Sequence, residues 1–290
     1  MIAGVDNDSI VYLNGQYVRL GDARISVLDR GFIFGDGIYD VVPAYAGRPF
    51  RMDEHLARLE RSLASIQITV DKTRADWEQL VTDMLQRSGL QNCIVYIQVT
   101  RGVAKRDHAF PTGITPTVFC MVSPFQRPDA AARDEGLSAV SIPDLRWLRC
   151  EIKSVSLLGN VLAKQAAVEA GVDEVLQFRD GMLTEGASCN VWLAKGGTLL
   201  APPRSNLILE GIRYRFLEEL AMQAGVPFEA RAITEAEVDE VDEIMITSAT
   251  REILPVTRYN GRPVGTGAPG PVYQTLRKGY DEAIRTLEQA

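Results

Sequence analysis

The stretch RWLRCEIKSVSLLGNVLAKQ, residues 146–165, decides how the rest of the chain is interpreted. Near its centre, Lys153 has mainly apolar or small neighbours and precedes a segment, residues 160–170, that we predict to be a helix. A lysine in such a setting can lose part of the hydration of its amine and become competent for Schiff-base chemistry. An ordinary surface lysine at the end of a strand is the commoner alternative, and these residues alone leave both interpretations open.

A second stretch, LTEGASCN at residues 183–190, places Glu185 in a turn between two strand-like segments. A carboxylate there could pair with a protonated ring nitrogen, which is how proteins keep pyridoxal phosphate an effective electron sink. A solvated turn glutamate is the simpler interpretation. Glu185 therefore indicates a cofactor site only if Lys153 is the lysine that binds the cofactor.

Two further segments have features of a phosphate site. LEGIR, residues 209–213, opens an amphipathic helix predicted over residues 212–224, and Gly211 lets backbone N–H groups approach an anion at the positive end of the helix dipole. TSAT, residues 247–250, follows an apolar run and could supply hydroxyl donors to the same anion. Each signal is weak alone, because many helices begin near a glycine and the hydroxyl run could simply end a strand.

The loop after a strand predicted at residues 93–100 contains Arg106 and His108. Arginine binds carboxylates through two parallel hydrogen bonds and a nearby imidazole can add another, so the pair suits an α-carboxylate group. As a lone pattern, an exposed polar loop is the alternative.

Periodicity and turn signals predict an α+β, or mixed α/β, class in two domains. A Pro-, Ala- and charge-rich connector follows the second buried strand and divides the chain into residues 1–127 and 128–290. Residues 29–50 are rich in β-branched and aromatic side chains punctuated by glycines, and we predict strand, turn and strand there. The first half further contains a predicted hairpin, two amphipathic helices and two buried strands, at residues 10–18, 53–66, 73–88, 93–100 and 117–122. The second half mixes helices with short strands and lacks the G-x-G-x-x-G of a dinucleotide-binding unit.

Composition excludes several classes of partner. The net charge of −7 and the lack of a Lys/Arg-rich block argue against nucleic acid. No apolar run approaches the roughly 20 residues of a membrane-spanning helix, and the start MIAGVDNDSI lacks the features of a signal peptide, so we expect a cytoplasmic protein without a membrane partner. Four widely spaced cysteines and only two histidines predict neither a disulfide framework nor a metal site.

Four ordered motifs together carry a family resemblance: DRGFIFGDGIYDVV, VTRGVAKRDHAFP, the opening stretch and LTEGASCNVW. The chain resembles the D-amino acid aminotransferases, in the fold-type IV group of pyridoxal 5'-phosphate enzymes that also includes branched-chain aminotransferases and aminodeoxychorismate lyases. The resemblance runs from about Val11 to the C-terminal helix. It implies a smaller N-terminal α/β domain and a larger C-terminal mixed α/β domain that binds the cofactor.

The resemblance also assigns roles to matching residues. Lys153 is similar to the lysine that binds the cofactor as a Schiff base and moves the substrate α-proton. The other cofactor-binding residues that it implies are Arg58, Glu185 and Ile212. We add Ser188 beside Glu185, and Arg213, Ser248 and Thr250 as groups that compensate in the phosphate site where this chain departs from the family pattern. Tyr39, Arg106 and His108 match the group that holds the substrate carboxylate.

The implied reaction moves the amino group of a D-amino acid, such as D-alanine or D-glutamate, to a 2-oxo acid in a homodimeric enzyme. Arg106 and His108 favour D-amino acids over the alternatives on the same scaffold, which are an L-branched-chain aminotransferase, an (R)-amine transaminase and an aminodeoxychorismate lyase. A protein that binds the cofactor without catalysis is the rival from another class. Three departures from the family pattern would favour this non-catalytic rival. Asp40 stands where Glu is usual, Arg213 where Thr is common, and Ala249 where a second hydroxyl is common.

Overall fold

The computed structural model describes residues 5–289. Residues 1–4 and 290 lie outside the described part, and so does the beginning of the N-terminal stretch in which we expected no signal peptide. Contacts divide the chain into two compact units. Unit 1 comprises the chain up to Gln126 together with Ile152–Leu157, and unit 2 comprises Arg127–Glu151 together with the chain from Leu158 onward. The expected domains 1–127 and 128–290 assign Ile152–Leu157 to the second part, whereas the backbone of this segment is hydrogen-bonded within unit 1.

Unit 1 is built on a six-stranded antiparallel sheet with the strand order β2-β1-β6-β5-β3-β4. Its hairpin turns at Asn14 and Gly15, which both have positive φ, as the favoured two-residue turn requires. The strands are Ile10–Leu13 (β1), Gln16–Arg19 (β2), Gly37–Tyr45 (β3), Arg48–Pro49 (β4), Cys93–Thr100 (β5) and Thr117–Pro124 (β6). The predicted hairpin and the two predicted buried strands are present.

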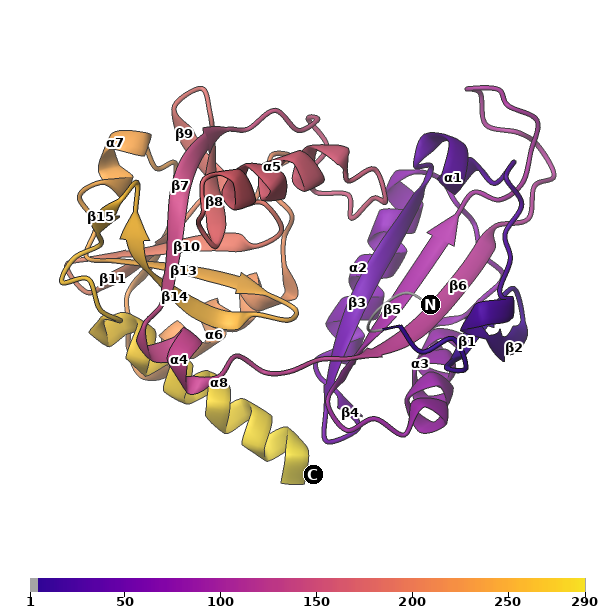
Figure 1. Ribbon diagram of the computed structural model, residues 1–290, viewed down its shortest axis with the longest axis horizontal. Coiled ribbons are helices and arrows are strands. Elements are labelled where there is room, and N and C mark those ends of the chain that lie inside the picture. The colour runs from indigo at the N-terminus through magenta and orange to yellow at the C-terminus, as the bar shows by residue number, and fades with distance from the viewer. Residues whose placement is uncertain (1–4, 290) are drawn as a thin grey trace. The chain divides into compact units, whose positions relative to one another are not determined.

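Two helices, α2 (Met52–Ser65) and α3 (Arg74–Ser88), pack on one face of this sheet (Figure 1). Leu56 and Leu59 of α2 and Trp77 of α3 are buried in one core with alternate residues of β3 and β5. Thr73 and the first turn of α3 form a reciprocal capping box, which fixes where that helix begins. Both helices match their predictions, because their apolar residues recur at helical spacing.

Of the strand, turn and strand predicted within residues 29–50, the first strand is wrong, because Arg30–Phe34 form a short helix, α1. The Asp29 carboxylate accepts a hydrogen bond from the Gly31 N–H at the helix start, and Gly35, with φ of 66°, ends it in the left-handed region. Asp29 also accepts hydrogen bonds from the hydroxyls of Thr100 and Thr117, so the cap is tied to the sheet. Local capping overrides the strand preference of the aromatic and β-branched residues.

Unit 2 contains a nine-stranded mixed sheet with the order β12-β11-β10-β13-β14-β7-β8-β9, and β15 pairs with β14. The strands are Leu137–Pro143 (β7), Glu174–Arg179 (β8), Met182–Gly186 (β9), Asn190–Lys195 (β10), Thr198–Ala201 (β11), Phe228–Ala230 (β12), Glu243–Ser248 (β13), Glu252–Tyr259 (β14) and Arg262–Pro263 (β15). Neighbours β14, β7 and β8 run parallel, whereas β10, β13 and β14 run antiparallel.

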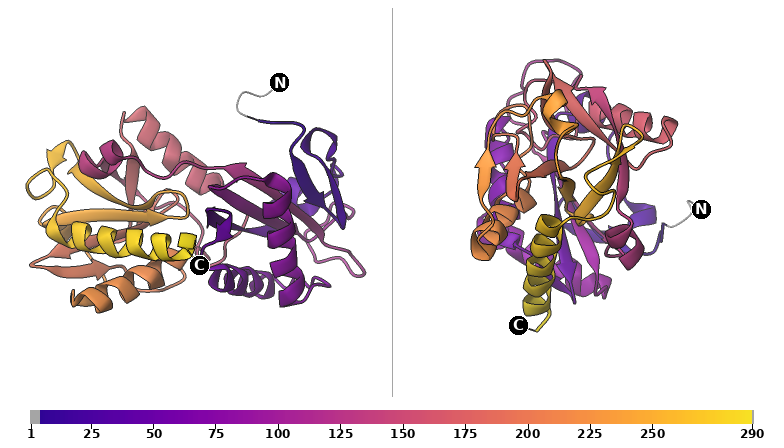
Figure 2. Two further views of the ribbon diagram at one scale, coloured as in Figure 1. Left: turned by 90° about the horizontal axis from the view of Figure 1, so that it is seen from below. Right: turned by 90° about the vertical axis from the view of Figure 1, so that its left-hand side faces the viewer.

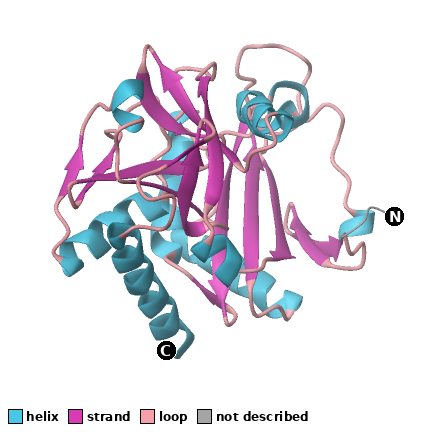
Figure 3. Ribbon diagram, turned by 60° about the vertical axis from the view of Figure 1, so that its left-hand side comes forward, coloured by secondary structure: helices cyan, strands magenta, loops and turns pink. Residues whose placement is uncertain are grey.

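The helices of unit 2 are Ala130–Asp134 (α4), Leu158–Glu169 (α5), Ile212–Ala224 (α6), Glu235–Val238 (α7) and Pro271–Gln289 (α8). Helix α5 packs on β7 and β8, while α8 runs beside α6 (Figure 2). The structure combines helices (cyan in Figure 3) with strands (magenta), and its sheets are antiparallel in unit 1 and mixed in unit 2, which confirms the α+β class. Within residues 5–289, no helix combines the length and apolar character needed to cross a bilayer.

Candidate active site

Lys153 lies on a segment fixed along the edge of β3. The Tyr39 N–H donates to the Lys153 carbonyl at 2.9 Å, and the Val155 N–H donates to the Gly37 carbonyl at 3.0 Å. The Lys153 N–H also faces the hydroxyl of buried Ser62 on α2 at 3.4 Å. The lysine therefore has a backbone position determined by two elements, unlike a lysine on a loose surface loop.

The Lys153 amine lies against an aromatic pair on unit 1. Its Nζ is 4.0 Å from the centre of the Tyr39 ring, and that ring stacks on Tyr96 with 5.6 Å between centroids. Burial, followed by the nearby Tyr39, raises the pKa of Tyr96 to about 12. The structure thus brings two of the predicted site residues, Lys153 and Tyr39, together.

Asp40 follows Tyr39 on the strand and points to the opposite face of the sheet, where its side chain is fully buried. Its Oδ1 lies 2.7 Å from His55 Nδ1, and Arg58 donates from Nε to Oδ2 and from Nη2 to Oδ1, each at 2.8 Å. Burial raises the pKa of Asp40, but the charges and hydrogen bonds of Arg58 and His55 outweigh it and hold that pKa well below its usual range.

One stripe of α2 positions these groups. His55, Arg58 and Ser62 are spaced by three and four residues, so they lie on one face of the helix, toward β3 and the Lys153 segment. Arg58, a predicted cofactor residue, is thereby joined to Asp40 through the Nε–Nη2 edge of its guanidinium.

Arg106 and His108 are exposed on the loop after β5. The loop is attached to α1: Arg30 donates from Nη1 to the Asp107 carbonyl at 2.5 Å and from Nη2 to the His108 carbonyl at 3.3 Å. The Phe34 ring lies 5.3 Å from the His108 ring and 5.4 Å from the Arg106 guanidinium carbon. These two residues therefore share one anchored loop, with both side chains open to solvent.

In unit 2, Glu185 is a buried carboxylate on β9 whose two oxygens are both in use. Oε1 accepts a hydrogen bond from Arg146 Nη1, while Oε2 accepts from the Leu209 N–H at 3.0 Å and from Asn190 Nδ2 at 3.4 Å. Burial raises the pKa of Glu185 above its ordinary value, although Arg146 opposes that shift.

Arg146 and Asp144 belong to the same cluster and were not among the predicted site residues. Arg146 donates from Nε to Asp144 Oδ1 at 2.9 Å and from Nη2 to Oδ2 at 2.8 Å. Burial raises the pKa of Asp144, but the hydrogen bonds and charge of Arg146 lower it to about 2. Arg146 opens the motif RWLRC, yet the sequence gives no means to distinguish it from Arg149, whose side chain is 53% exposed.

The start of α6 and the turn after β13 come together in unit 2. A Cβ at Gly211 would approach Asn190 Oδ1 to 2.3 Å, so only glycine allows this close entry to the helix. Arg213 is buried and its Nη2 donates to the Ala249 carbonyl at 3.4 Å. Ile212 is buried in the first turn of α6.

The predicted hydroxyl donors are distributed around this turn. The Ser248 Oγ accepts from the Arg251 N–H at 3.1 Å, and the neighbouring Thr247 hydroxyl accepts from Trp192 Nε1 at 3.0 Å. Thr250 and Ser188 are exposed, Ser188 on the turn between β9 and β10.

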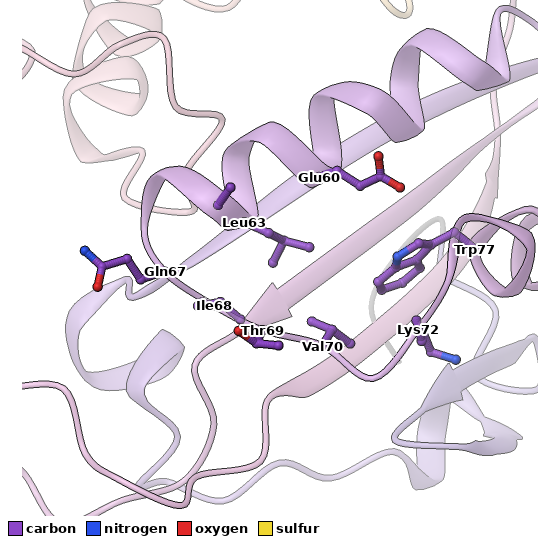
Figure 4. Close-up of a pocket in the computed structure, with 9 residues that line it drawn as sticks. Glu60, Leu63, Gln67, Ile68, Thr69, Val70, Lys72 and Trp77 are labelled. Carbon is purple, nitrogen blue, oxygen red and sulfur yellow. The ribbon is translucent and has the colours of Figure 1, made fainter.

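A separate groove of about 410 Å³ lies in unit 1 at the end of α2 (Figure 4). None of the predicted site residues lines it. Its lining residues are Glu60, Leu63, Ala64, Gln67, Ile68, Thr69, Val70, Lys72 and Trp77.

Solved structures with the same fold include several branched-chain aminotransferases. The branched-chain amino acid aminotransferase of Escherichia coli matches with a TM-score of 0.90 at 23% identity, covering 95% of this chain and 94% of that one. The branched-chain aminotransferase of Thermoproteus uzoniensis, crystallised with norvaline, matches with a TM-score of 0.85 at 24% identity, covering 95% of each chain. A further branched-chain enzyme, crystallised with pyridoxamine 5'-phosphate, matches with a TM-score of 0.89 at 24% identity, covering 96% and 94%. At these identities the likeness defines the fold, which is that of the fold-type IV aminotransferases.

The sequence comparisons define the family. Residues 37–259 match the family described as amino-transferase class IV, and the chain belongs to it. A D-alanine aminotransferase of Staphylococcus haemolyticus is 38% identical over 277 residues, covering 95% of this chain and 98% of that relative. A D-alanine aminotransferase of Bacillus licheniformis is 38% identical over 274 residues, covering 94% and 96%. The family resemblance seen in the four motifs is confirmed.

Proposed function

We propose that this protein transfers the amino group of a D-amino acid, such as D-alanine, to a 2-oxo acid with the aid of pyridoxal 5'-phosphate. The observation that carries the proposal is the fixed position of Lys153, whose amine lies 4.0 Å from the centre of the Tyr39 ring on a segment bonded to β3. Membership of class IV and 38% identity to proteins named D-alanine aminotransferase support it.

The donor set of the chain fits the cofactor. The pyridine nitrogen needs an anionic partner, and Glu185 is a buried carboxylate on β9, not in the turn that the sequence predicted. The phosphate needs N–H groups and positive charge, which the start of α6 at Ile212, Arg213 and the turn holding Ser248 offer. We assign Arg58 to the phosphate as well, with Ser188 and Thr250 as further hydroxyl donors. When bound, the cofactor withdraws electrons from the substrate α-carbon.

Lys153 has two tasks in this proposal. Its Nζ would hold the cofactor covalently in the resting enzyme, and as a free amine the same Nζ would take the proton from the substrate α-carbon and act as the acid that gives it back on the same face. Tyr39, which contacts that amine, orients it toward the substrate.

We assign recognition of the substrate carboxylate to Tyr39, Arg106 and His108. The support is chemical: Arg106 and His108 present a cation and an imidazole on one loop that Arg30 fixes from α1. Purified protein should react with D-alanine and 2-oxoglutarate, and not with L-leucine and 2-oxoglutarate. Reaction with L-leucine alone would assign the chain to the branched-chain substrates of its structural neighbours.

A spectroscopic experiment tests the cofactor assignment separately from the substrate. The protein should show the visible band of a lysine-bound cofactor, and the band should shift when a D-amino acid is added. Lys153→Ala should bind the cofactor without that band. A protein whose band no amino donor shifts would be a binding protein without catalysis.

We also propose a homodimer. Helix α5 buries Ala163 and Ala167 against β8 but leaves Leu158, Val161 and Leu162 exposed by 71%, 59% and 61%. Apolar residues at this spacing form a stripe whose burial a second copy would provide. Sedimentation should show a dimer that Val161→Asp dissociates and that Glu169→Gln, on the same helix, leaves intact; a monomeric native protein contradicts the proposal.

We further infer that the enzyme works in the cytoplasm. All four cysteines are free and buried, as is usual in a reducing compartment. Fractionation of cells that express the protein tests this.

A further inference from the structure

Arg213 occupies an unusual position for a buried cation. It is the second residue of α6, after the capping Gly211, and only 2% of its surface is exposed. The N-terminal turn of a helix is its positive end, so an arginine there is unfavourable unless an anion lies nearby. The turn after β13, which Arg213 contacts, has Ala249 between the hydroxyl residues Ser248 and Thr250.

Arg213 connects the first turn of α6 to α8 and to the turn after β13. Its Nε donates to the hydroxyl of Tyr280 on α8 at 3.1 Å, and its Nη2 donates to the Ala249 carbonyl at 3.4 Å. Tyr280 is fully buried, with its ring 5.1 Å from Phe216 of α6 and 4.6 Å from the guanidinium of Arg277. The tyrosine hydroxyl is thus held at a defined point beside Arg213.

Helix α8 reaches the same turn through a second contact. Arg277 forms an ion pair of 2.8 Å with Glu252, which begins β14 immediately after the turn. At the other end, the buried carboxylate of Glu243 accepts the N–H groups of Val272 and Tyr273 and so fixes the start of α8. The helix is therefore attached to both sides of the turn that holds Ser248 and Ala249.

We propose that α8 is part of the cofactor's phosphate site in this chain, with Tyr280 as a positioning residue for Arg213 and Arg213 as the cation that binds the phosphate. The inference rests on the proposed function, because it takes the start of α6 and the turn after β13 as the phosphate site. A guanidinium offers several N–H donors in one plane and places a full charge beside the phosphate dianion. Docking of α8 and binding of the phosphate then stabilise each other.

Tyr280→Phe tests the positioning role, because it removes the hydroxyl and keeps the ring. The protein is loaded with pyridoxamine 5'-phosphate, which has no covalent link to lysine, and its dissociation constant is measured by equilibrium dialysis beside that of unphosphorylated pyridoxamine. We expect binding of the phosphorylated form to weaken on the order of tenfold, as for loss of a hydrogen bond to a charged group, and binding of pyridoxamine to stay unchanged. Arg213→Met should weaken the phosphorylated form further, and Arg213→Lys less than Arg213→Met.

Tyr273→Phe is the matched control. Tyr273 lies on the same helix as Tyr280 and is buried, and within the described residues its hydroxyl has no hydrogen-bond partner. It should bind pyridoxamine 5'-phosphate within about twofold of the native protein, in the range of ordinary neutral substitutions.

Hydrogen exchange of residues 271–289 gives a readout that needs no variant. Pyridoxamine 5'-phosphate should slow exchange in α8 of the native protein and pyridoxamine should not. Equal affinity of Tyr280→Phe and native protein, or unchanged exchange in α8, overturns the inference while leaving the proposed function intact. A native protein that binds neither pyridoxal 5'-phosphate nor pyridoxamine 5'-phosphate overturns both.

Discussion

Asp40 in unit 1 and Glu185 in unit 2 are both buried carboxylates in contact with an arginine, and their pKa values shift in opposite directions. Asp40 is bonded by Arg58 through two hydrogen bonds and by His55 through a third. Two basic side chains thus serve one carboxylate, and together they outweigh the cost of burial.

The cluster around Glu185 has fewer cations for each carboxylate. Its arginine, Arg146, is bonded by two hydrogen bonds to Asp144 and reaches Glu185 with its remaining Nη1. Asp144 also forms an ion pair of 3.1 Å with Arg179, so two guanidinium groups serve two carboxylates, and only Arg146 reaches Glu185. Glu185 is left with burial as the dominant influence on its pKa.

The difference teaches that the ratio of cations to carboxylates, more than burial, decides the role a buried acid can take. The lowered pKa of Asp40 keeps this carboxylate ionised, and as an anion it holds Arg58 and His55 in place. Glu185 favours an additional positive partner, which is what a protonated pyridine nitrogen provides in the proposed function. Four substitutions and a pH series probe this contrast.

The largest effect should come from Arg146→Met, which leaves Asp144 and Glu185 buried without their shared cation. Loss of one partner of a buried ion pair costs about 3–5 kcal/mol of unfolding free energy. Urea unfolding measures it. Arg149→Met, three residues away at an exposed pair with Glu151, should cost under about 0.5 kcal/mol. Equal losses in the two variants would show that the cluster in unit 2 is not electrostatically coupled.

Asp40→Asn should rank second, at about 3 kcal/mol at neutral pH, because Arg58 remains buried without its carboxylate. The same urea experiment measures it, with Asp22→Asn, at an exposed pair with Arg19, as the control. A loss no larger than that of the control would mean that Asp40 does not hold Arg58.

The pH series should separate the two carboxylates by sign. The folded-state pKa of Asp40 lies below its unfolded value, so its contribution is complete above about pH 4 and is lost as the pH falls. The folded-state pKa of Glu185 lies above its unfolded value, so its contribution is complete below about pH 4 and is lost as the pH rises. The stability differences of Asp40→Asn and Glu185→Gln from the native protein, measured without cofactor, should therefore change in opposite directions with pH, by at most about 1.4 kcal/mol per pH unit. Parallel changes would refute the contrast.

Asp40→Glu should have the smallest effect, about 1 kcal/mol, because it keeps the charge and adds one methylene to a filled site. The unfolding midpoint measures it. A loss as large as that of Asp40→Asn would mean that the shorter carboxylate is required by the geometry of Arg58.

The sequence predicts the elements whose pattern is local. Helix α2 and strand β5 follow from spacing of apolar residues, and their predicted bounds lie within a residue or two of those observed. Helix α1 was missed because its start depends on the Asp29 cap, and that cap is fixed by Thr100 and Thr117 from distant strands. Capping that rests on tertiary contacts leaves little signal in a short segment.

The residues of the candidate site also fall into those that the sequence could identify and those that it could not. Lys153, Arg58 and Glu185 could be named because motifs surround them, and their roles stay predictions. The partnership of Asp40 with His55, and of Arg146 with Asp144, could not be named, because sequence does not show which of several charged residues is buried. Only the fold selects Arg146 over Arg149.

The segment Ile152–Leu157 belongs to unit 1 although the chain on both sides of it belongs to unit 2. Unit 1 therefore cannot be completed during synthesis until the ribosome has passed residue 157, long after β6 has emerged. A cut at residue 126 would yield one fragment without the lysine and another holding the lysine without the strand that fixes it. The chain is thus a poor choice for division into two independently expressed pieces, and a circular permutant should keep residues 127–157 continuous.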